Sequence, residues 1–198
     1  MLLIRKPTAE FIAATMRSQR TARFTYDAVG WTRERKVPTG FATTRWQAVI
    51  GRGEDDLRRA KQVAAELRML RLGWIEPAGP LEPIAPESLV CTLARQSGMY
   101  SLNVGRVIYV DDAADSFAFG YGTLPEYPIR GEERFAVALD RGTNDVTFEI
   151  FSFSTPRSPL MLLARPLLRE IQRRFCTQSS AAMSGAVRAA GHPAAVPA

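Results

Sequence analysis

Apolar and polar residues alternate along the second half of the chain with the two-residue period of β-strands. The alternating stretches cover residues 88–110 (one or two strands), 116–124, 133–140 and 145–153. Turn signals separate them at residues 111–112, 125–131 and 141–144. Because antiparallel strands can be joined by tight turns whereas parallel strands need long crossovers, this succession predicts an antiparallel meander.

The first half of the chain predicts two helices and one further strand. Residues 7–18 begin with a proline and a threonine, which favour a helix start. Residues 41–51 alternate loosely, and the more apolar phase, which contains Trp46 and Ile50, is expected to face inward. Residues 53–73 have acidic residues in the first turn, a terminating glycine, and an apolar stripe at Leu57, Ala60, Val63, Ala64, Leu67 and Leu70.

The last patterned segment is the helix predicted for residues 158–175. Its apolar residues recur at helical spacing, at Leu160, Leu163, Ala164, Leu167, Leu168, Ile171 and Phe175. Pro166 should bend this helix or break it near its first turn. Beyond Thr177 the composition is rich in Ala, Gly, Ser and Pro. We therefore predict a single domain over residues 1–177 and a disordered tail over residues 178–198.

The order of these elements is helix, strand, helix, several antiparallel strands and a long C-terminal helix. We expect an α+β fold in which a curved antiparallel sheet wraps around the C-terminal helix, since this buries one sheet face and the helix stripe together. Wherever the sheet and the helix do not touch fully a cavity remains, and such cavities are common ligand sites.

The hairpin around residues 117–137 carries the candidate polar chemistry. Phe117, Phe119, Tyr121 and Thr123 share the inward face of its first strand. Small residues, Ala118, Gly120 and Gly122, share the other face, where they let another segment approach closely.

Two adjacent glutamates stand on the second strand of that hairpin. Glu133 follows the apolar phase of Phe135 and is expected to point inward, whereas Glu132 is expected to face outward with Arg134. A buried carboxylate needs a partner, because an unpaired buried charge would take up a proton instead. By strand order, the expected partners of Glu133 are Tyr121 and Arg106.

Charge and composition narrow the function classes. The 198-residue chain has a net charge of +6, and nearly all of its positive side chains are arginines. Arginines 165, 169 and 173 form a stripe on the last helix, but Glu170 interrupts it and no aromatic residues interleave with it. We therefore expect a solvated face and no nucleic-acid partner. The only histidine, His192, lies in the predicted tail, which argues against Ser–His and Cys–His catalysis and against a histidine-ligated metal centre.

The sequence also bounds the compartment. The two cysteines, Cys91 and Cys176, are far apart and lack metal-like spacing. The longest apolar run falls well short of the roughly 20 residues that a transmembrane helix needs. We expect a soluble, cytoplasmic protein that has no transmembrane segment and needs no cofactor.

Four segments carry a family resemblance: NVGRVIYV, FAFGYGTL, GEERFAV and FEIFSFSTP, followed by an arginine-rich final helix. Together they resemble the bacterial and plant domain-of-unknown-function family nineteen-ninety. The chain departs from this family at Tyr127, where the family often has a histidine, and in STPRSP, which replaces SRP. The resemblance implies a START-like, helix-grip fold, a class that commonly binds hydrophobic molecules between the sheet and the C-terminal helix.

Pattern and resemblance together predict a domain that binds a small apolar molecule, such as a lipid, in that position. The expected ligand-binding residues are Arg106, Phe117, Phe119, Tyr121, Thr123, Glu133, Phe135, Leu163 and Leu167. One alternative is an acid–base enzyme of the cyclase, dehydratase or isomerase type, with Glu133 as base and Tyr121 as proton donor. The other alternative is an ion pair that only fixes the strand register.

Overall fold

Eight strands form one antiparallel sheet in the computed structural model, which describes residues 1–96, 98–157 and 165–191. Seven of them lie in the order β2-β8-β7-β6-β5-β4-β3, and β1 pairs with β5. The strands are β1 (Leu2–Leu3), β2 (Ala42–Arg52), β3 (Ile75–Pro77), β4 (Leu89–Gln96), β5 (Met99–Ala113), β6 (Ser116–Thr123), β7 (Ile129–Leu139) and β8 (Asp145–Pro156). The helices are α1 (Ala9–Gln19), η1 (Trp31–Glu34), α2 (Gly53–Ala65), η2 (Arg68–Leu70) and α4 (Arg165–Gly191).

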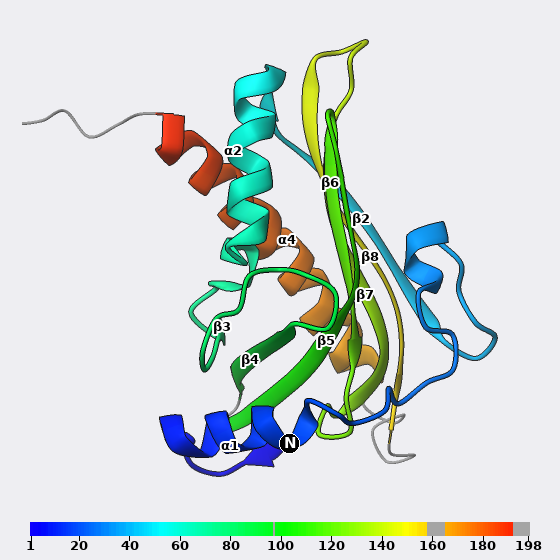
Figure 1. Ribbon diagram of the computed structural model, residues 1–198, viewed down its shortest axis with the longest axis vertical. Helices are drawn as coiled ribbons and strands as arrows, with labels where there is room; N and C mark the ends of the chain where they lie inside the picture. The colour runs from blue at the N-terminus through cyan, green and yellow to red at the C-terminus, as the bar shows by residue number, and fades with distance from the viewer. Residues whose placement is uncertain (97, 158–164, 192–198) are drawn as a thin grey trace, which may run out of the picture.

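The sheet curves around α4, which confirms the predicted α+β fold with a sheet wrapped around the C-terminal helix (Figure 1). Helices α2 and α4 lie on the concave side of the sheet, whereas η1 lies on the opposite side (Figure 1). The inward faces of the strands therefore look towards α4, and the outward faces look towards the N-terminal part of the chain.

The end of the concave surface beneath α2 is a packed apolar core. Two cross-strand rows form its floor: Phe117–Val137–Phe148 and Phe119–Phe135–Ile150. Above them lie the apolar stripe of α2 and the C-terminal part of α4, which adds Met183 and Val187. Phe119, Phe135, Phe148 and Ile150 have no exposed surface, so they belong to the interior of the domain.

Helix α2 ends at Ala65, earlier than the predicted stop at Gly73. Leu67 adopts a left-handed conformation with φ of 55°, and η2 then carries Met69 and Leu70 into the core. The hydroxyl of Ser179 in α4 donates to the carbonyl of Met69 at 2.9 Å. This bond satisfies a carbonyl that lies beyond the end of the helix. All six residues of the predicted stripe are nevertheless buried.

The prediction of a disordered tail from residue 178 is wrong for residues 178–191, because α4 continues to Gly191. Met183 and Val187 are fully buried, and the indole N–H of Trp46 donates to the hydroxyl of Ser180 at 2.9 Å. Small residues, which the composition treats as a sign of disorder, here let α4 pack closely, and alanine favours the helix itself. Residues 192–198 lie outside the described residues. No helix in the described part of the chain is long and apolar enough to cross a membrane.

The convex side of the sheet is covered by the N-terminal part of the chain. The rings of Phe24 and Tyr26 lie over Gly122, and the ring of Tyr109 lies over Gly120, where any side chain would collide with them. The prediction that the small residues of β6 allow a close approach from behind is therefore confirmed.

Glu132 lies on the outward face of β7, as the sequence pattern predicts. It is nevertheless only 2% exposed, because the covering segment lies over it. Its carboxyl group accepts hydrogen bonds from the Tyr26 hydroxyl at 2.8 Å, the Gly30 N–H at 2.8 Å and the Thr32 N–H at 2.9 Å. The Thr32 hydroxyl donates to it as well. The pattern placed Glu132 on the correct face, but it could not reveal that residues 24–35 cover that face.

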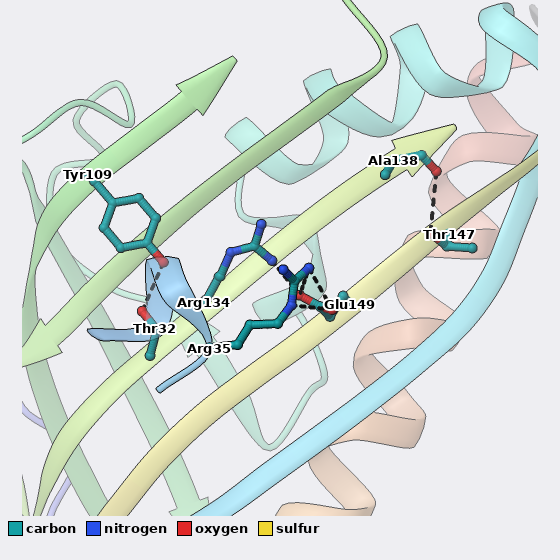
Figure 2. A network of polar contacts seen from close by, with 7 residues as sticks. All are labelled: Thr32, Arg35, Tyr109, Arg134, Ala138, Thr147 and Glu149. Atoms are coloured by element: carbon teal, nitrogen blue, oxygen red, sulfur yellow. Dashed lines mark hydrogen bonds and ion pairs between the residues drawn. The ribbon is translucent and has the colours of Figure 1, made fainter. Parts of the chain in front are cut away.

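A second polar network extends along the same side (Figure 2). The hydroxyls of Thr32 and Tyr109 are 2.9 Å apart, which joins η1 to β5. Glu149 accepts from Arg35 at 3.1 Å and also pairs with Arg134 of β7. These bonds attach η1 and the residue after it to the convex face of the sheet.

Candidate functional site

Beyond the apolar rows, the inward face of the sheet becomes polar. Tyr121, Glu133 and Ser152 are paired in register across β6, β7 and β8. The following row contains Thr123, Gly131 and Ser154. Because inward positions recur every second residue, the change from the apolar row Phe119–Phe135–Ile150 to polar residues occurs at the same level on all three strands. The alternation therefore builds a polar wall next to the core.

A cavity of about 280 Å³ lies between this polar wall and the N-terminal part of α4. The helix contributes Leu168, Ile171, Gln172 and Phe175. The remaining apolar lining comes chiefly from Leu70, Trp74 and Ile75, and β4 and β5 add Thr92, Ala94, Ser101 and Asn103. The cavity thus has an apolar side and a polar side, an arrangement typical of small-molecule sites.

Glu133 and Tyr121 form the most strongly perturbed pair in this lining. The Tyr121 hydroxyl donates to Oε2 of Glu133 at 2.6 Å. Burial raises the pKa of Glu133 to about 7, and the hydrogen bond from Tyr121 opposes that rise. Burial and the neighbouring carboxyl group together raise the pKa of Tyr121 well above its usual value. Glu133 can therefore change protonation state near neutral pH, while Tyr121 stays protonated.

Tyr127 belongs to the same polar group. It lines the cavity, and its hydroxyl interacts with that of Tyr121. Burial, followed by the charge of Glu133, raises the pKa of Tyr127. This is the position at which the chain departs from the family resemblance, so the departure falls inside the cavity.

Other polar side chains of the lining have hydrogen-bond partners within the protein. The Ser101 hydroxyl donates to Oδ1 of Asn103 at 2.6 Å, and the amide of Gln172 donates to the hydroxyl of Ser154 at 3.4 Å. The Thr123 hydroxyl accepts from the Gly131 N–H at 2.9 Å and lies 2.8 Å from the Thr25 hydroxyl. The described part of the chain contains no group of three or more His, Cys, Asp or Glu side chains that could hold a metal ion.

Three of the nine residues predicted to bind a ligand line the cavity: Tyr121, Thr123 and Glu133. Phe117, Phe119 and Phe135 point to the same side of the sheet but belong to the adjoining packed core. Leu167 is 62% exposed, whereas Leu168, which the predicted stripe also contains, lines the cavity. Leu163 lies outside the described residues.

Arg106 is not a partner of Glu133. It pairs in register with Gly122, so its side chain lies on the convex face, whereas Tyr121 pairs with Val107. There the guanidinium donates to the carbonyl of Arg20 at 2.8 Å and stacks on the ring of Phe24 at 4.6 Å. A bulge in β5 between Val107 and Tyr109 changes the phase of the strand, so Arg106 and the inward Val110 lie on opposite faces although they are four residues apart.

Sequence reasoning missed several residues of the lining, including Trp74, Asn103, Tyr127, Ser152 and Gln172. Ser152 could have been found, since it stands in the inward phase of β8 with Phe148 and Ile150. The loop residue Tyr127 and the helix residue Gln172 have no comparable signal, because their positions depend on how the loop and α4 meet the sheet.

The chain resembles proteins that are already known. It is 32% identical over 201 residues to the UPF0548 protein of Deinococcus radiodurans, an alignment that covers 96% of this chain and 100% of the relative. Its fold resembles that of TTHA0849 from Thermus thermophilus, with a TM-score of 0.57, 17% identity, and 76% of this chain and 100% of that chain covered. It also resembles the Zhui aromatase/cyclase from Streptomyces sp. R1128, with a TM-score of 0.53, 11% identity, and 78% and 98% covered.

These likenesses agree with the architecture described above. Because the identities are so low, the two solved structures support only the assignment of the fold. That fold is the START-like helix-grip fold. The sequence match is more specific, because residues 25–182 fit the family described as Domain of unknown function (DUF1990). Because this family model matches most of the chain, and because the chain is 32% identical to a relative that it covers fully, the chain belongs to the DUF1990 family.

Proposed function

We propose that the protein binds a small molecule with an apolar body and a polar group in the cavity between the sheet and α4. The observation that carries this proposal is the two-sided lining of the cavity of about 280 Å³. An apolar cavity of about 150 Å³ holds benzene, so this space suits a molecule of roughly two rings or a short chain. Its apolar body would lie against Leu168, Ile171 and Phe175, and its polar group would face Glu133 and Tyr121.

Burial of the apolar body would supply most of the binding free energy, at roughly 25 cal/mol per Å² removed from water. The polar group would fix the orientation, because the inward carboxyl group and the tyrosine hydroxyl stand on neighbouring strands with a fixed register. The same positions are occupied by phenylalanines one row away. The polar row is therefore the part of the sheet that can distinguish one ligand from another.

A second candidate function is acid–base catalysis in the same cavity. Two observations favour it: the 2.6 Å bond between Tyr121 and Glu133, and the pKa of about 7 for Glu133. A base whose pKa lies near the working pH is well matched to proton transfer. One solved structure of this fold is named an aromatase/cyclase, so catalysis is compatible with the fold. This candidate predicts that Glu133→Gln abolishes turnover of a bound substrate without unfolding the protein.

The binding proposal can be tested by native mass spectrometry of the purified protein, combined with titration of the uncharged fluorescent probe N-phenyl-1-naphthylamine. We expect a bound compound or a saturable rise in probe fluorescence. Ile171→Trp, which places a large ring in the cavity, should abolish both signals. Leu167→Trp adds the same ring at a position that is 62% exposed and should leave both unchanged. Absence of any bound compound, together with equal fluorescence for the wild type and Ile171→Trp, would overturn the proposal.

A further inference from the structure

We infer that the cavity selects an uncharged ligand that carries a hydroxyl group and excludes carboxylates and phosphates. This inference rests on the proposed binding function and names the class of molecule that the cavity takes. It follows from the charges that line the cavity and from the one side-chain oxygen of Glu133 that is left open.

The described residues that line the cavity include no Arg, Lys or His. This absence is informative in a chain with 26 lysines and arginines and a net charge of +6. A ligand carboxylate or phosphate that left water for this space would lose its hydration without gaining an opposite charge. It would also face Glu133, and two like charges at such a distance disfavour each other.

Three cationic groups outside the lining have partners within the protein. Arg174 is exposed and stacks on the ring of Trp74, with 4.8 Å between the guanidinium carbon and the ring centre. Arg157, also exposed, donates to the carbonyl of Pro125. The amino group of Met1 donates to the carbonyls of Leu102, at 2.8 Å, and Glu126. Each of these groups has a protein partner, and none belongs to the cavity lining.

The carboxyl group of Glu133 has one oxygen available to a ligand. Oε2 accepts from the Tyr121 hydroxyl, and the described residues supply no hydrogen-bond donor to Oε1. Glu133 keeps some exposed surface even though Tyr121 beside it is only 4% exposed. Because the cavity lies in front of this residue, the open oxygen is the natural anchor for a polar group of the ligand.

A hydroxyl group suits this anchor better than a carbonyl group. With a pKa of about 7, Glu133 presents either an ionised acceptor or a protonated donor at neutral pH. A hydroxyl can donate to the first and accept from the second, whereas a carbonyl group can only accept. Tyr121 and Tyr127, whose pKa values are raised, remain neutral and add no charge.

Two probes with the same ring system test the inference: 2-naphthol, which is uncharged, and 2-naphthoate. Equilibrium dialysis at about pH 8, above the pKa of Glu133, should give at least about tenfold tighter binding of 2-naphthol, which corresponds to about 1.4 kcal/mol. Glu133→Gln should reduce this ratio, because it removes the charge that repels the naphthoate. Glu170→Gln removes an exposed carboxyl group from the outer side of α4 and should leave the ratio unchanged.

A second measurement needs no variant. Lowering the pH from about 8 to about 6 protonates Glu133 while the naphthoate stays ionised, so naphthoate binding should strengthen severalfold. Burial lowers the pKa of the Met1 amino group, so this group is a second candidate source of a pH effect. Loss of the pH effect in Glu133→Gln assigns it to Glu133.

Binding of 2-naphthoate as tight as that of 2-naphthol at the higher pH would overturn the inference but leave the proposed function standing. If neither 2-naphthol nor 2-naphthoate binds, while N-phenyl-1-naphthylamine still distinguishes the wild type from Ile171→Trp, the inference is likewise overturned and the proposed function stands. Failure of all three probes, with no compound bound to the purified protein, would overturn the proposed function itself.

Discussion

Glu132 and Glu133 are neighbours in the sequence, yet they stand on opposite faces of β7 in opposite environments. Glu132 lies beneath the N-terminal segment and accepts hydrogen bonds from four donors, two of them backbone N–H groups. Glu133 faces the cavity and accepts one, from Tyr121. The same type of side chain is thus a structural anchor on one face, at Glu132, and a candidate ligand-binding group on the other, at Glu133.

The number of donors explains the difference. A carboxyl group whose lone pairs are all occupied can offer nothing to a ligand, whereas one with an open oxygen can bind or transfer a proton. Burial alone does not identify a functional acid, since Glu132 is the more deeply buried of the two. Three substitutions test this contrast, in order of decreasing expected effect.

The largest effect is expected for Glu132→Gln. The amide nitrogen of glutamine is a donor, so it would face groups that are themselves donors, among them the N–H groups of Gly30 and Thr32. We expect the free energy of unfolding to fall by about 3 kcal/mol or more, as when buried hydrogen-bonding groups lose a charged partner. Urea denaturation at neutral pH measures the change.

The exposed Glu170→Gln serves as the control and should change the free energy of unfolding by less than about 0.5 kcal/mol. A loss of under about 1 kcal/mol for Glu132→Gln would mean that the four-donor site is not a structural anchor.

The second effect concerns Glu133→Gln and the pH dependence of stability. The folded-state pKa of Glu133 is raised from 4.5 to about 7, so folding favours its protonated form. The contribution of Glu133 to stability is therefore fully present below about pH 4.5 and is lost as the pH rises to about 7, by at most about 3 kcal/mol. The variant lacks this loss, so relative to the wild type it should be more stable at about pH 8 than at about pH 5.

Urea denaturation of both proteins at the two pH values gives the free energy of unfolding of the variant minus that of the wild type at each pH. The comparison between the two pH values then isolates the effect of titration, because the loss of the Tyr121 bond contributes equally at both wherever that bond does not depend on pH. An unchanged difference between the two pH values would show that Glu133 titrates at its ordinary pKa and is not held away from water.

The smallest effect is expected for Tyr121→Phe. The Tyr121 hydroxyl lowers the pKa of Glu133 against the larger effect of burial. Its removal should therefore raise that pKa further, by about one unit if the bond contributes about 1.4 kcal/mol. A ¹³C NMR titration of the glutamate carboxyl groups would follow the change, with Glu133→Gln used to assign the signal.

Tyr109→Phe is the matched control, because its hydroxyl bonds to Thr32 on the convex face. It should leave the titration of Glu133 unchanged. Equal shifts in the two variants would indicate a general loosening of the sheet instead of a specific bond.

The fold could be predicted well from the sequence because its strongest signals are local. Alternation located the strands, and the small residues of β6 correctly indicated a close approach from behind. The extent of α4 could not be predicted, since a tail rich in alanine and serine has no clear apolar stripe. Its order depends on contacts such as Ser179 with Met69, which only the tertiary structure creates.

The candidate site was predictable only in part. The inward direction of Glu133 and its pairing with Tyr121 followed from alternation and hairpin register. Arg106 was misplaced because a bulge between Val107 and Tyr109 changes the phase of β5, and alternation along the sequence does not reveal such a bulge. The burial of Glu132 depends on residues about 100 positions away, which no local pattern reports.

Helix α4 runs through two different environments, the packed core and the cavity. Its later turns, around Met183 and Val187, lie in the packed core, while its earlier turns at Leu168, Ile171 and Gln172 border the cavity. Substitutions far apart usually act independently on stability. Substitutions in the early turns should therefore change the lining of the cavity while the later turns keep the helix in place.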